Sequence, residues 1–247
     1  MNRFQAAGIH LGISLTIAAL VGCLIYFVWY PHPYFQVAGG STLMLLIMGV
    51  DIMIGPLLTL VVYKTDKKSL RFDLSCIAIL QVCAFFYGFW VIAQARPVFI
   101  VAAVDRFIPV YANDIEDADL AQAKRPEFAT RSWTGPRLVG AILPSDPKER
   151  SNLVFSGLAG KDLEKFPKYY VPYSEVAATM LAKSRPLGDL AAKSARNGTI
   201  IGQYLTDKHI PIEKLIYLPM SGRTDEYIVV FLSSNNRPFD ALMIDPW

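Results

Sequence analysis

An acidic residue, Asp51, stands inside an otherwise apolar stretch of the sequence. A carboxylate at the centre of a membrane-spanning helix is costly unless protein surrounds it, which makes Asp51 a candidate for recognition or for chemistry. At helical spacing it shares a face with Gly55 and Thr59, and small and polar residues in this pattern are typical of helix packing in membranes. Pro56 follows on the same run and removes one hydrogen bond of the helix.

Three interpretations of Asp51 are open from the residues alone. A protonated Asp51 would tie the helices together by hydrogen bonds to Thr16, Thr59 or Gln81. In the second interpretation, the helix face that carries Asp51 binds a helix of another protein, and Gly55 allows the close approach. A proton relay is the third interpretation, and it is weakened because relays usually need several ionisable groups. The stripe of small residues predicted to face Asp51 from the first apolar run is Gly12, Thr16, Ala19 and Cys23.

The side chains that usually carry catalysis are scarce elsewhere. The polar part of the chain has a single histidine, His209, no cysteine, no metal-binding spacing and no glycine-rich phosphate loop. The acids between Asp114 and Asp119 are typical of a solvated helix start. The sequence therefore predicts that the protein is not an enzyme and binds no metal and no cofactor. A hydrolase that uses carboxylates alone is left open.

The elements that position Asp51 must lie in lipid, because 53% of the residues are hydrophobic, 18% are charged and the mean hydropathy is +0.33. Apolar runs at about 11–30, 37–62 and 74–95 are each long enough to cross roughly 30 Å of hydrocarbon as a helix. We predict a three-helix transmembrane region over residues 1–96. A cleaved signal peptide is disfavoured, since no small-residue cleavage site follows the first run.

The distribution of charge predicts the orientation. Lys64, Lys67, Lys68 and Arg71 crowd the loop between the second and third runs, and such cationic loops stay in the cytoplasm. The amino terminus is then cytoplasmic and everything after Ala95 lies outside. Residues 97–247 hold 18 basic and 18 acidic residues, so the outer part shows no basic surface and a nucleic-acid partner is excluded.

Residues 97–247 are predicted to form one α+β domain, with strands at both ends and helices in the middle. The strands are predicted at 98–104, 107–111, 137–143, 215–218, 227–233 and 239–244. The helices are predicted at 114–123, 147–160, 174–183 and, more weakly, 187–207, with a division at Asn197-Gly198.

Short motifs follow one another along the chain in a defined order. They are the run 49–60 around Asp51 and Pro56, Arg96-Pro97-Val98-Phe99, Val104-Asp105-Arg106-Phe107, Thr134-Gly135-Pro136, and the closing Ile244-Asp245-Pro246-Trp247. Their order, spacing and three-span context resemble the TfpX/TfpZ family of type IV pilin accessory proteins. The resemblance covers essentially the whole chain.

The resemblance implies a multi-pass inner-membrane protein of a Gram-negative bacterium with a periplasmic domain. Such a protein assists a cognate type IV pilin, in a chaperone-like manner, in pilus assembly or in the balance of extension and retraction. The implied partners are the major pilin, other inner-membrane pilus assembly proteins and the lipid bilayer. No enzymatic activity is implied, and no catalytic or ligand residue carries over.

Our hypothesis from these observations is that Asp51, Gly55 and Thr59 pack on the pilin helix while the outer domain contacts the pilin head. For Arg96, Asp105, Arg106 and Trp247, bracing of the protein itself is weighed against direct pilin contact. The competing class is a sensor or receptor with a ligand-binding outer domain, although its cytoplasmic segments are too short for an output domain. A small-solute transporter is a third class, and three spans seldom form a pathway.

Overall fold

The structure is a computed structural model that describes residues 2–65, 67–223 and 225–247. Within one long helix it does not describe the side chains of residues 42, 43, 46, 47, 50 and 51. The chain divides between Arg96 and Pro97 into a helical unit, Met1–Arg96, and a C-terminal unit, Pro97–Trp247.

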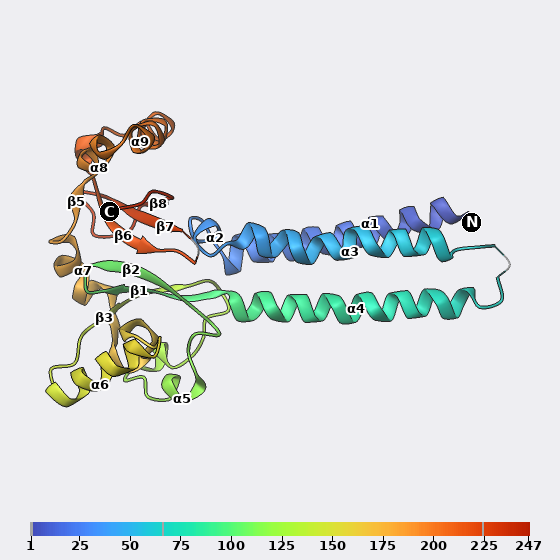
Figure 1. Cartoon of the computed structure of the whole chain (residues 1–247), viewed down its shortest axis with the longest axis horizontal. Coiled ribbons are helices and arrows are strands. Elements are labelled where there is room, and N and C mark those ends of the chain that lie inside the picture. Colours follow the sequence, from blue (N-terminus) through green and yellow to red (C-terminus); the bar gives the residue numbers. More distant parts are fainter. Residues whose placement is uncertain (1, 66, 224) are drawn as a thin grey trace. The chain divides into compact units, whose positions relative to one another are not determined.

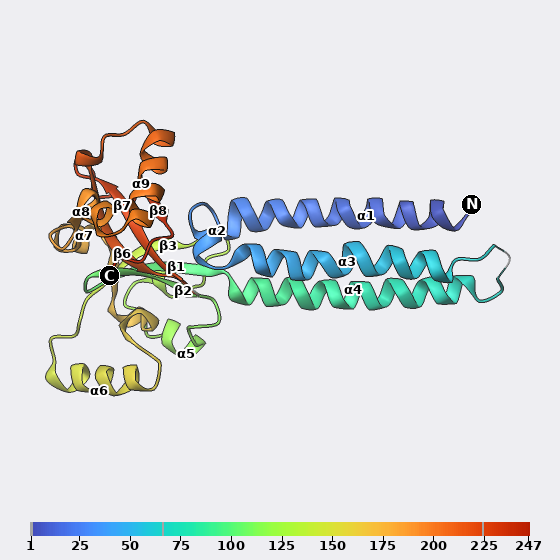
Figure 2. The same cartoon turned by 45° about the horizontal axis from the view of Figure 1, so that its top comes forward.

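Long helices that run side by side form the helical unit (Figures 1 and 2). Their bounds are Arg3–Leu24 for α1, which continues into a π-helical turn, η1, at Ile25–Trp29, then Tyr34–Val37 for the short α2, Gly40–Val62 for α3 and Leu70–Ala95 for α4. Helix α3 packs against both α1 and α4, so it lies between the other two long helices.

The long helices extend the predicted apolar runs. Helix α1 begins at Arg3, well before residue 11, because Asn2 and Gln5 form a capping box in which each side chain accepts a hydrogen bond from the other's backbone N–H. Among the described residues, Arg3–Trp29 and Leu70–Ala95 are long and apolar enough to cross a membrane, while Ile52–Val62 of α3 is a shorter apolar stretch. The amino-terminal helix is therefore a candidate membrane anchor, with a second possible span in α4.

The C-terminal unit is an α+β domain, as the sequence predicts. In its described part, eight strands form one sheet in the order β4-β3-β1-β2-β6-β7-β8, with β5 paired to β6. The strands are β1 Pro97–Ala103, β2 Arg106–Tyr111, β3 Arg137–Ala141, β4 Tyr170–Pro172, β5 Arg185–Pro186, β6 Leu215–Ser221, β7 Glu226–Leu232 and β8 Asp240–Leu242.

The sheet mixes hairpins with parallel pairs. Strands β1 and β2 form one antiparallel hairpin and β6 and β7 form another, whereas β1 pairs with β3 and β2 pairs with β6 in parallel. The parallel contact of β2 and β6 places Phe107 beside Met220. The carboxyl-terminal strands thus join the first strands of the unit, which agrees with the prediction of strands at both ends.

Short helices lie around the sheet (Figure 1). They are α5 Asp117–Leu120, α6 Pro147–Leu158, α7 Tyr173–Leu181, α8 Leu187–Lys193 and α9 Ala195–Lys208. Helices α8 and α9 bury Leu190 and Ile201 over β6 and β7. Helix α7 lies on β3, where Gly140 allows the approach of Val176: a Cβ at Gly140 would lie 2.4 Å from Val176 Cγ2.

Two of the predicted helices differ from the structure. The helix predicted at 114–123 is only α5, because the residues before it form a loop in which Asp114 accepts a hydrogen bond from Tyr111 N. The helix predicted at 187–207 is divided at Ser194 and not at Asn197-Gly198. Ser194 has extended backbone and its hydroxyl accepts from Asn197 N at 3.1 Å, so it ends α8 and caps α9.

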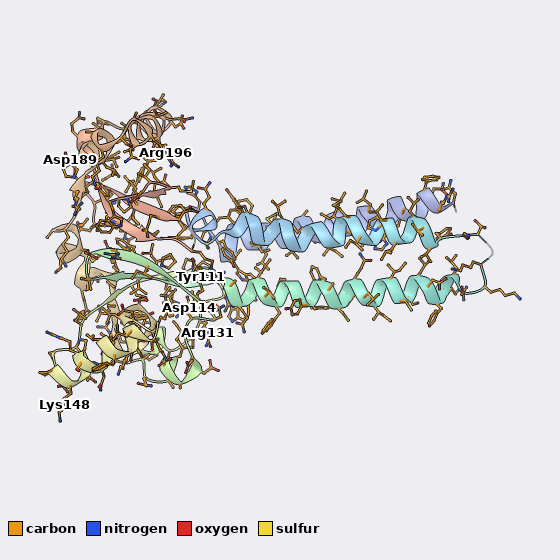
Figure 3. All side chains as sticks on the ribbon, viewed as in Figure 1. Tyr111, Asp114, Arg131, Lys148, Asp189 and Arg196 are labelled. Carbon is orange, nitrogen blue, oxygen red and sulfur yellow. The ribbon has the colours of Figure 1, made fainter. Side chains whose placement is uncertain are left out.

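Arg131 holds the loop that precedes α5. Its Nε donates to the carbonyl of Ala112 at 2.8 Å, its Nη2 donates to the carbonyl of Ile115, and its Nη1 pairs with Asp117. Figure 3 shows Arg131 close to Tyr111 and Asp114, at the end of β2. One guanidinium therefore satisfies backbone groups whose residues are almost fully buried.

Candidate functional site

Two polar side chains from other helices lie against α3 at neighbouring levels. A hydrogen bond of 2.6 Å joins Thr59 Oγ1 to Nδ1 of His10 on α1, and Thr59 is 3% exposed. One turn away, Gln81 of α4 lies directly against Gly55, where a Cβ would be 1.8 Å from its Nε2. Gly55 and Thr59 are thus brought together, and both contact helices of this same unit.

The backbone of Asp51 lies in α3. Along the helix axis, Asp51 comes one turn before Gly55, and Thr59 comes one turn after Gly55. Its side chain lies outside the described residues, so the predicted packing of Asp51 on a pilin helix stays a prediction. Pro56 lies inside the same helix and is buried. The backbone nevertheless places Asp51 in line with Gly55 and Thr59, as helical periodicity requires.

The stripe of α1 that packs against α3 differs from the predicted one. Gly12, Thr16, Ala19 and Cys23 are all exposed. The packed positions include Ala6, Ser14 and Gly22, which are buried, and His10. Gly22 lies against Met44 and Met48 of α3, whose terminal carbons would be 2.9 and 3.2 Å from a Cβ at this position. The prediction was wrong because two stripes of small residues run along this helix.

Sequence reasoning therefore missed His10 and Ser14 as functional candidates. A signal for them was present in the spacing. Small or polar residues recur every four positions on α1, at Ala6, His10, Ser14, Ala18 and Gly22. Such a repeat is typical of the helix face that allows close backbone approach in a membrane.

A groove of about 350 Å³ lies between α1 and α4. Met48 of α3 contributes to its lining, and its polar lining residues are His10, Ser14 and Gln81. The remaining lining residues are apolar, namely Ile13, Ile17, Ala18 and Val21 of α1, Ile25 of η1, and Ala78, Val82, Phe85, Phe86, Phe89 and Ile92 of α4. The groove is consequently apolar along most of its length with polar groups toward one end.

Aromatic contacts close the opposite end of this groove. The ring centroids of Trp29 and Phe89 are 5.2 Å apart, and the hydroxyl of Tyr30 donates to the carbonyl of Ile92 at 3.2 Å. The guanidinium of Arg96 lies 5.8 Å from the Trp29 ring centroid and donates through Nη1 to the carbonyl of Ala93. Arg96, which is 3% exposed, thus braces the end of α4.

Motif residues from opposite ends of the C-terminal unit meet at the β1–β2 turn. Arg106 Nε donates to Asp105 Oδ1 at 2.9 Å and holds the pKa of that carboxyl below its usual value. The same guanidinium lies 5.3 Å from the ring centroid of Trp247. Val104 occupies the turn with φ 57°, a conformation that a β-branched residue rarely adopts.

The closing residues are held by their own contacts. Asp245 Oδ1 accepts from Trp247 N at 2.9 Å, and the carbonyl of Pro246 accepts from Nζ of Lys193 at 3.1 Å. Trp247 is 56% exposed. The tail is therefore held on the domain, and its last residue is left more than half exposed.

The surroundings of the other motif residues indicate structural roles. Pro97 begins β1, and Phe107 of β2 is fully buried. Gly135 has φ 100°, which only glycine adopts readily, and with Pro136 it forms the turn that leads into β3. His209 ends α9 with a left-handed backbone and is exposed. Among the residues that the structure describes, no group of three His, Cys, Asp or Glu side chains is placed to hold a metal ion.

Comparison with known proteins gives the family. The fimbrial assembly protein FimB family matches residues 1–39. The fimbrial assembly protein of serogroup I from Dichelobacter nodosus is 35% identical over 245 residues, which are 98% of this chain and 95% of the relative. The serogroup E1 protein of the same organism is 32% identical over the same shares of both chains. No solved structure gives a significant match. With this identity sustained over almost its whole length, the chain belongs to the family of fimbrial assembly proteins.

Proposed function

We propose that this protein assists the assembly of type IV fimbriae as a non-enzymatic protein of the bacterial inner membrane that binds a cognate pilin. The observation that carries the proposal is the near-full-length similarity to proteins named for fimbrial assembly. The order of the short motifs supports a place in the TfpX/TfpZ subgroup. A helical unit with an exposed apolar groove supports a partner that lies in the membrane.

Deletion of the gene tests this role. We expect the deletion strain to lose most of its surface pili, counted by electron microscopy, and a plasmid copy of the gene to restore them. Tagged protein purified in mild detergent is expected to carry pilin with it. Normal piliation in the deletion strain, with no pilin in the purified material, would show that the proposed function is wrong.

The proposed topology has three spans, a cytoplasmic amino terminus and a periplasmic C-terminal unit. Its support is the cationic loop of Lys64, Lys67, Lys68 and Arg71, since such loops stay in the cytoplasm. Alkaline phosphatase, which matures only in an oxidising compartment, reports the side of its fusion point. We expect activity for a fusion after Trp247 and none for a fusion after Lys68. The reverse pattern would contradict the orientation.

A further inference from the structure

The groove between α1 and α4 is elongated along the helices. Its lining on α1 and the first residue of η1 runs from His10 to Ile25, which corresponds to about 22 Å of helix at 1.5 Å per residue. Side chains at three- and four-residue intervals form each wall, so the groove follows the ridges of two neighbouring helices. A depression of this shape accepts the side chains of one face of an additional helix.

The groove is open along its side. Ile13 and Ile17 of α1 are 56% and 43% exposed, and Val82 and Phe86 of α4 are 53% and 63% exposed. The end near Trp29 is closed, because Trp29 packs on Phe89. An occupant therefore enters from the lipid side and not along the axis of the helices.

The polar lining residues favour a helix over a lipid chain as the occupant of the groove. Acyl chains would match the apolar walls, but they offer nothing to His10 and Ser14, which lie about two to three turns into α1. His10 uses Nδ1 in its bond with Thr59, and its other ring nitrogen, Nε2, is a second hydrogen-bonding atom. The complement is an apolar helix face that carries one polar side chain, and a carboxylate is the strongest partner for an imidazole N–H.

We propose that this groove receives one membrane-spanning helix of the partner, with a hydrogen-bonding side chain, best a carboxylate, beside His10. The proposal rests on the proposed function, under which the partner is the pilin. It places the contact on α1 and α4 and assigns Gly55 and Thr59 to the packing of α3 against those helices.

Photo-crosslinking in the native membrane tests the groove. A benzophenone amino acid is placed at Phe86, which lines the groove and is 63% exposed, or at Tyr87, which does not line it and is comparably exposed at 68%. Adjacent helical positions point about 100° apart, so the two probes sample different surfaces at one depth. We expect position 86 to crosslink to a membrane-spanning peptide of pilin, identified by mass spectrometry, and position 87 not to do so.

Filling the groove gives a second measurement. Ala78→Trp places an indole among the lining residues, whereas Ala19→Trp places one on the exposed face of α1. We expect Ala78→Trp to lower pilin recovery about tenfold, the scale of one strong interface contact, and Ala19→Trp to leave it nearly unchanged. His10→Leu is expected to lower recovery more than Thr59→Val, because the valine removes only the internal partner of the imidazole.

The outcomes separate this proposal from the proposed function. Pilin that co-purifies without a crosslink at position 86, or that crosslinks equally at both positions, overturns the groove and leaves the function standing. A lipid adduct or a second copy of this chain at position 86 likewise overturns it. Equal losses for His10→Leu and Thr59→Val would overturn the contact beside His10. If no pilin is recovered with the unaltered protein, both proposals fail.

Discussion

Phe107→Ala is expected to lower the free energy of unfolding of the C-terminal unit by about 3–5 kcal/mol, the usual cost of removing a buried phenylalanine ring. Phe107 is fully buried, and its ring centroid lies 5.7 Å from that of Phe231 and 6.0 Å from that of Tyr173. One side chain thus joins β2 to β7 and to α7. Its removal leaves a cavity where these three elements meet.

Urea-dependent proteolysis of the full-length protein in detergent measures this effect through the loss of intact C-terminal unit. Phe155→Ala is the matched control, since Phe155 on α6 is 68% exposed and its truncation is expected to change stability within about 0.5 kcal/mol. Similar shifts for both variants would show that Phe107 is not the centre of this core.

Arg131→Ala is expected to lower the free energy of unfolding by about 2–4 kcal/mol, because it leaves the buried carbonyls of Ala112 and Ile115 without a donor. Arg131→Lys recovers only part of this loss, since an ammonium does not reach the same acceptors with a planar fork. The proteolysis assay used for Phe107 reports the change.

Arg125→Ala is the control for Arg131. Arg125 pairs with Glu175 at 2.7 Å, but the two side chains are 43% and 45% exposed, so the pair contributes less than about 1 kcal/mol. A loss for Arg125→Ala as large as that for Arg131→Ala would contradict the role given to the buried carbonyls.

The apolar runs predicted the long helices because hydrophobic length is a strong signal that needs no tertiary information. The packing face of each helix was harder to predict from the sequence. Both the stripe through Gly12 and the stripe through Ser14 satisfy the small-residue pattern. The position of Met44 and Met48 against Gly22, with the bond of His10 to Thr59, decides between them. Which of two equivalent faces packs depends on side chains of another helix, which periodicity within one helix does not contain.

The candidate site shows the same division. Asp51, Gly55 and Thr59 were predicted to share a face, and the backbone of α3 places them in line. Thr59 contacts His10 and Gly55 contacts Gln81, and both of these partners come from other helices. In the C-terminal unit, the contact of Arg106 with Trp247 joins residues from opposite ends of the domain. Pairings of this kind follow from topology and have no local signature.

The parallel pairing of β2 with β6 governs when the domain is able to fold. Phe107 meets Met220 only after α5 through α9 have been synthesised, so the hairpin of β1 and β2 has an unpaired edge while most of the unit is made. Contacts so distant in sequence form slowly, and an open strand edge invites pairing with other chains. Chains truncated before β6 would therefore retain this exposed edge and be prone to aggregate.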